Sequence, residues 1–168
     1  MPDPLVEMSR SEDRGERVRA ARLAARSGAG ENDEIVLRLL RDGDSTAVSE
    51  VMVAALLEAR REAAVPLILR SLGQAGGAAD EAAQCALEGL LSSELDDVDV
   101  RGSIVSVVQG THDRLELIGA LAAISWLAPG GGFPAPPAAR VHVAELAGDP
   151  DEMISEAAQR ALAALAPR

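Results

Sequence analysis

The chain has 168 residues, of which 48% are hydrophobic and 26% charged, so it is long enough and apolar enough to fold as one domain with a core. Only Trp126 and Phe133 are aromatic, which argues against sandwiches and barrels, because their strands depend on aromatic and β-branched side chains. Sixteen arginines, with no lysine, oppose 27 acidic residues and leave a net charge of −11. Such a charge repels phosphate backbones and anionic headgroups, so neither nucleic acid nor a membrane is an expected partner.

The start of the chain shows neither the basic stretch nor the apolar stretch of a secretory signal, and a single cysteine, Cys85, allows no internal disulfide. Residues 117–139 carry no charge, but their second half, Pro129–Pro137, is rich in Gly and Pro and cannot continue a helix. The apolar helix that remains, about 117–127, is too short to cross a bilayer. We therefore expect a cytoplasmic protein.

The chain alternates between two kinds of predicted helix after a flexible N-terminal end over residues 1–10. The alanine-rich segments cover 16–26, 48–58, 79–90, 116–127 and 154–165. The segments rich in branched aliphatic residues cover 35–40, 65–72, 98–108 and 141–146. As strands, these aliphatic segments would give a parallel α/β fold, but the Leu and Arg residues of 38–41 and 67–72 favour helices, so an all-α fold is the main expectation.

Four of the alanine-rich segments are related in sequence. Residues 81–90, Glu-Ala-Ala-Gln-Cys-Ala-Leu-Glu-Gly-Leu, recur at 156–165 as Glu-Ala-Ala-Gln-Arg-Ala-Leu-Ala-Ala-Leu. Weaker copies begin at residues 50 and 118, so the successive starts are 31, 37 and 38 residues apart. A period of this length is typical of helical solenoids.

The boundary before the last segment supports this register. Gly148 is placed to end one helix, Asp149 to cap the next and Pro150 to occupy its first turn. Asp151 and Glu152 would then lie at the positive end of the helix dipole.

The turn and helix over Asp149–Leu162, and the shorter match over Val48–Leu56, resemble the HEAT-type helical repeat. In that family an aliphatic outer helix leads through an Asp-containing turn into an inner helix reading Val-Arg-x-x-Ala-x-x-Ala-Leu. The Val-Arg pair appears as Val18-Arg19, with the following alanines out of register, and serine replaces the arginine at positions 49 and 155. The resemblance covers 11–166. It implies one domain over 11–168, a right-handed α-α superhelix of about four helical hairpins plus an N-terminal helix.

Helical geometry separates a packed side from a wet side of each alanine-rich segment, because each residue turns the helix by about 100°. Acidic and amide side chains fall on the wet sides. These residues are Glu50, Glu81, Gln84, Glu88, Glu156 and Gln159.

In the HEAT family these inner helices line a concave groove, so the resemblance implies an acidic groove in which Glu50, Glu81 and Glu156 align. Ile118 interrupts that ladder in the third copy. Two interpretations stay open: a solvated face built of good helix formers, or a groove that binds a basic peptide or protein segment.

The loop Pro129–Pro137 is the most unusual segment, with three consecutive glycines before Phe133 and spaced prolines after it. Phe133 is either a contact for a partner or a side chain that folds back over an apolar gap. A tolerated insertion between paired helices is the simplest explanation of the loop.

No arrangement typical of catalysis occurs in the sequence. His112 and His142 fall in different repeats, and the absence of lysine excludes a phosphate-binding P-loop and a Schiff base. Cys85 lies on an alanine-rich helix with nothing nearby to lower its pKa, so an inert thiol is expected. We therefore expect no catalytic residue, no metal and no cofactor, and a module that binds another protein or a basic peptide.

Two alternatives remain. Some HEAT-like proteins attach or position bilin chromophores, so the resemblance also allows a lyase or chaperone-type protein that handles a chromophore or modified substrate. HEAT-like excision of damaged DNA bases would need a basic, aromatic-lined groove, which this composition lacks. The final helix ends in Ala163–Arg168 with little polar capping, so a self-associating structural element, as a homodimer through that helix, is the other alternative.

Overall fold

The computed structural model describes residues 3–28, 30–74, 81–92, 99–128, 133 and 135–166, and for residues 61, 62, 81–83 and 92 it describes the backbone alone. These residues form helices and turns and contain no strand, so the all-α prediction is confirmed over them. The helices are α1 (Pro4–Ser9), α2 (Arg14–Arg26), α3 (Asp33–Leu40), α4 (Thr46–Ala59), α5 (Arg61–Gln74), α6 (Glu81–Ser92), α7 (Val100–Gly110), α8 (Arg114–Leu127), α9 (Pro137–Leu146) and α10 (Glu152–Leu165). No described helix has both the length and the apolar content that crossing a membrane requires.

Within residues 1–10, for which the sequence suggested a flexible end, Pro4–Ser9 form helix α1. Asp3 accepts a hydrogen bond from the backbone N–H of Leu5 at 2.8 Å, and Pro4 occupies the first position of α1. Both features start a helix, because an N-cap acceptor satisfies a free N–H and proline has none to satisfy. Leu5, Val6 and Met8 then pack against the core.

The start of α10 also differs from the prediction. Asp149 was expected as the cap, but α10 begins two residues later with Asp151 as its N-cap. Asp149 instead accepts a hydrogen bond from the N–H of Asp151 at 2.8 Å, which stabilises the turn before the helix.

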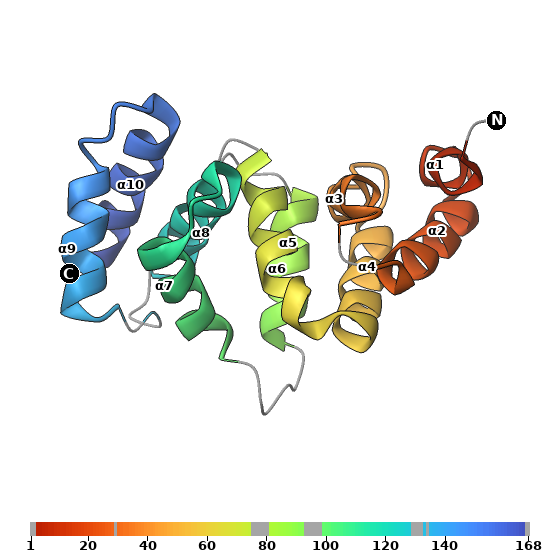
Figure 1. The fold of residues 1–168 in the computed structure, drawn as a ribbon, viewed down its shortest axis with the longest axis horizontal. Coiled ribbons are helices and arrows are strands. Elements are labelled where there is room, and N and C mark those ends of the chain that lie inside the picture. Colours follow the sequence, from red (N-terminus) through yellow and green to blue (C-terminus); the bar gives the residue numbers. More distant parts are fainter. Residues whose placement is uncertain are drawn as a thin grey trace.

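Neighbouring helices lie side by side as pairs, and the pairs follow one another along the long axis of the molecule, from α1 and α2 at one end to α9 and α10 at the other (Figure 1). The alanine-rich helices α2, α4 and α6 pack in sequence, as stacked copies would. The pattern changes after α6: among the described residues α8 packs most extensively on α5, and α10 then packs on α8. The row of acidic residues expected from a regular stack is therefore interrupted between α6 and α8.

Two glycines allow the close contact between α5 and α8. A Cβ atom at Gly73 would overlap the backbone carbonyl of Leu115, and one at Gly119 would overlap the carbonyl of Leu69. Because the obstacles are backbone atoms, no side-chain rearrangement would make room. The two helices can approach this closely only where both positions lack a side chain.

Three arginine–aspartate ion pairs connect successive helix pairs. Arg17 on α2 reaches Asp42, with 2.6 Å between Nε and Oδ2, and both side chains are buried. Nε of Arg70 on α5 lies 3.5 Å from Oδ2 of Asp113, the N-cap of α8. Arg114 on α8 forms two hydrogen bonds with Asp151, the N-cap of α10. In each case the aspartate also accepts hydrogen bonds from backbone N–H groups at the start of its own helix or turn. One aspartate side chain thus stabilises the start of a helix or turn and connects two helix pairs.

Candidate functional site

The predicted binding residues are on the surface where the structure describes their side chains. Gln84 is half-buried and the others are exposed: Glu50, Glu88, Glu156 and Gln159. Glu81 begins α6, but its side chain lies outside the described part of the structure. Ile118, expected to interrupt the row, is fully buried in α8.

Glu50 and Glu88 belong to neighbouring helices. α4 and α6 are in contact, and a Cβ atom at Gly89 would lie 3.7 Å from Cγ1 of Val53, which fixes the sides that the two helices turn toward each other. Glu50 lies three residues before Val53, and Glu88 lies directly before Gly89. Their positions on the two helices thus place both carboxylates on the exposed strips that border this contact.

Glu156 and Gln159 lie on α10, which is separated from α6 by α5 and α8. Gln159 donates weak hydrogen bonds to the carbonyl oxygen of Ala147, at 3.4 Å, and to Oγ of Ser155, at 3.3 Å. Its amide therefore holds the preceding turn to α10. Glu50 and Glu88 thus lie on two helices in contact, and Glu156 and Gln159 form a second exposed group.

A groove lies between α2 and α4 and has a volume of about 370 Å³. Small apolar side chains of α4 form much of its lining, Arg22 and Arg26 of α2 line it too, and Glu58 of α4 adds an acidic group. The lining residues of α4 are Val51, Ala54, Ala55, Glu58 and Ala59. This is a different surface from a uniformly acidic groove, because its charge changes sign between α2 and α4.

The sequence contained a signal for this basic side that a chain-wide count of charge concealed. α2 has five arginines and one glutamate, although the chain as a whole carries −11. Arg22 and Arg26 stand four residues apart, so they project from one side of the helix. Arg17 of the same helix forms an ion pair with Asp42, whereas neither Arg22 nor Arg26 forms an ion pair with a described residue.

Phe133 is only 5% exposed and belongs to the core cluster. Of the two roles that the sequence left open, covering an apolar surface is the one that its position fits. Ala135 donates a backbone hydrogen bond to the carbonyl oxygen of Phe133 at 3.0 Å. Residues 129–132 and 134 of the predicted loop lie outside the described residues, and its last residue, Pro137, begins α9.

Among the described ionisable groups, the ion pair of Arg114 and Asp151 shifts the pKa of both side chains. Hydrogen bonds from Arg114 lower the pKa of Asp151 below its ordinary value of 3.8, and backbone N–H groups of α10 act in the same direction. The same bonds raise the pKa of Arg114. This pair is structural, since it joins α8 to the start of α10.

No three His, Cys, Asp or Glu side chains of the described residues gather in a way that could hold a metal ion. His112 is exposed, and His142 lies on α9 with 3.2 Å between its Nδ1 and Oε2 of Glu145. Comparisons of the chain with family models, with curated proteins and with solved structures gave no match.

Proposed function

We propose that the chain is a non-catalytic, HEAT-like helical-repeat module of the cytoplasm that binds an extended segment of another protein across α2, α4 and α6. The observation that carries this proposal is the groove between α2 and α4, which is lined by alanines and a valine and bordered by charges of both signs. Alanine side chains leave room at a helix surface for a ligand's own side chains, and flanking charges fix its orientation.

The distribution of charge defines the segment that fits. Arg22 and Arg26 attract an acidic residue where the segment crosses α2. Glu50, Glu58 and Glu88 are exposed, and none forms an ion pair with a described residue, so they attract basic residues over α4 and α6. The sequence predicted a basic peptide as the ligand. We now expect a peptide with basic residues over α4 and α6 and an acidic residue where it crosses α2.

Random peptides displayed on phage and selected on the immobilised chain test this proposal. We expect the selected peptides to be rich in Arg and to bind less tightly as salt rises, because exposed charge pairs are screened. The double variant Glu50→Arg/Glu88→Arg should weaken the binding of those peptides about tenfold or more, as the loss of two complementary pairs predicts.

Glu34→Arg is the matched control, since Glu34 is an exposed acid on α3 that lies beside Arg38 and Arg41 and does not line the groove between α2 and α4. It introduces the same kind of charge change and should leave peptide binding unaltered. Peptides that bind the double variant as tightly as the unmodified chain would contradict the proposal. So would a selection that yields no peptide above background.

A further inference from the structure

Large apolar side chains are exposed at both ends of the row of helix pairs. Among the described residues, the large hydrophobic side chains with substantial exposure are Leu23 (44%), Val141 (60%) and Met153 (37%). Leu23 lies on α2 of the first pair, and Val141 and Met153 lie on α9 and α10 of the last. An array of helix pairs leaves the outer faces of its end pairs uncovered, so exposed apolar residues there mark surfaces that a further layer can cover.

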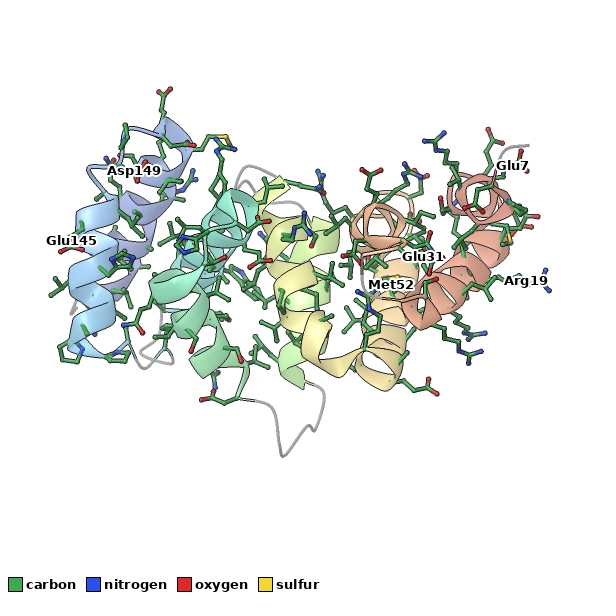
Figure 2. The ribbon with its side chains drawn as sticks, viewed as in Figure 1. Glu7, Arg19, Glu31, Met52, Glu145 and Asp149 are labelled. Atoms are coloured by element: carbon green, nitrogen blue, oxygen red, sulfur yellow. The ribbon has the colours of Figure 1, made fainter. Side chains whose placement is uncertain are left out.

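The outer face of α2 combines this apolar residue with positive charge. Arg19 precedes Leu23 by four residues, so the two side chains share one side of the helix. Figure 2 shows Arg19 pointing away from the molecule at this end. This face borders the groove, because Arg26, which lines the groove facing α4, lies two helical turns after Arg19 on the same side of α2.

The outer face of α9 is its complement. Val141 precedes Glu145 by four residues, and Glu145 points outward at the opposite end of the molecule from Arg19 (Figure 2). A β-branched residue on a solvated helix face is disfavoured by helix propensity, so local structure gives no reason for Val141 at this position. The flanking residues Ala138 and Ala144 are exposed and small, which allows close approach of another helix.

We propose that α2 of one copy of this chain docks antiparallel on α9 of a second copy. In that orientation Arg19 faces Glu145 while Leu23 faces Val141, because both pairs span four residues, or about 6 Å along a helix. One contact thus pairs opposite charges and covers two exposed apolar side chains. Parallel docking would instead place Arg19 against Val141 and Leu23 against Glu145.

The two faces are different surfaces of the same chain, so the contact is heterologous. Each docked pair leaves one α2 face and one α9 face free, so association continues into open chains unless the geometry closes a ring. This distinguishes the proposal from a two-fold homodimer through α10, which would end at two copies.

Sedimentation of the 168-residue chain over a range of concentrations at low salt tests the contact. We expect a mass that grows with concentration beyond that of a dimer. Arg19→Glu alone and Glu145→Arg alone should each weaken association about tenfold or more, and the double variant Arg19→Glu/Glu145→Arg should restore it. Glu34→Arg, an exposed acid on α3, serves as the control and should associate normally.

A second experiment uses one blocked face per chain. Leu23→Asp and Val141→Asp affect exposed side chains, so both variants should keep the far-ultraviolet circular dichroism of the unmodified chain while remaining monomeric. An equimolar mixture should form a one-to-one dimer and nothing larger, because one variant retains α9 and the other retains α2. A monomeric unmodified chain, an association that stops at two copies, a double charge swap without restored association, or a mixture that stays monomeric would each overturn the proposal.

Discussion

Gly73 and Gly119 set the distance between α5 and α8, and each is costly where it stands. A glycine inside a helix is less favourable than alanine by about 1 kcal/mol, so two of them in facing helices need a compensating contact. The compensation is close packing: Gly119 lies against the carbonyl of Leu69, and Gly73 against that of Leu115. These residues make possible the most extensive helix–helix contact among the described residues.

Gly119→Ala tests this account. The added methyl group overlaps backbone, so α5 and α8 must separate, and we expect the free energy of unfolding to fall by about 1–3 kcal/mol despite the better helix propensity of alanine. Urea unfolding followed by circular dichroism measures the change. Gly110→Ala is the control, since a Cβ there has nothing within 4 Å, and it should leave stability equal or slightly higher. Equal stability of the two variants would contradict the close-packing explanation.

At the scale of the element, aspartates start several helices and also connect them. Asp151 accepts hydrogen bonds from the N–H groups of Met153 and Ile154 in α10 and pairs with Arg114 of α8. Because Arg114 lowers the pKa of Asp151, the ionised carboxylate is favoured in the folded chain. The stability that this pair adds is therefore present above the ordinary pKa and is lost as the pH falls through the lowered one.

Asp151→Asn removes the charge that pairs with Arg114 and keeps the helix cap, because asparagine caps helices about as well as aspartate. We expect a lower melting temperature than that of the unmodified chain at neutral pH, and a difference that shrinks as the pH falls below the lowered pKa of Asp151. Thermal unfolding at a series of pH values gives this difference directly. Asp99→Asn provides the comparison, since Asp99 caps α7 by accepting from the N–H of Gly102 without an ion pair to a described residue. A difference that stays constant across the acid range would argue against the role of Arg114.

The elements themselves were predictable where local pattern decides them. The alanine-rich and aliphatic segments predicted from the sequence match helices α2 to α10 to within a few residues, because helical periodicity and alanine content act within each segment. α1 was missed because a six-residue helix has too short a pattern, and its stability comes from packing on α2. The pairing of α5 with α8 depends on Gly73 and Gly119, which lie 46 positions apart in the sequence and carry no local sign of their contact.

In the candidate site too, local sequence pattern predicts which residues are exposed, whereas helix packing decides which of them are neighbours. Helical rotation placed Glu50, Glu88 and Glu156 on exposed faces, and each is exposed in the structure. Which of these faces adjoin is set by the order of helix packing, and α5 and α8 separate Glu156 from the other two. The basic side of the groove at Arg22 was missed because net charge was considered for the whole chain, whereas recognition depends on charge at one surface.

At the scale of the molecule, the helix pairs form a row in which contacts are made chiefly between neighbours (Figure 1). Stability in such an array is close to a sum of terms for each pair and each interface, so a defect at one interface need not spread. The α5–α8 contact joins the pairs from α7 onward to those before them. We therefore expect this interface to couple the stability of the helices before it to that of the helices after it.

Amide hydrogen exchange on Gly119→Ala tests whether this interface divides the molecule. We expect protection in α8 and α10 to fall about tenfold or more, because α8 loses its closest partner and α10 packs on α8. Protection in α2 and α4 should change much less, since their contacts with each other and with α6 do not involve Gly119. Gly110→Ala again provides the reference, and mass spectrometry of peptic fragments resolves the individual helices. An equal fall in all helices would show instead that the row unfolds as one cooperative unit, with the α5–α8 contact no more separable than any other.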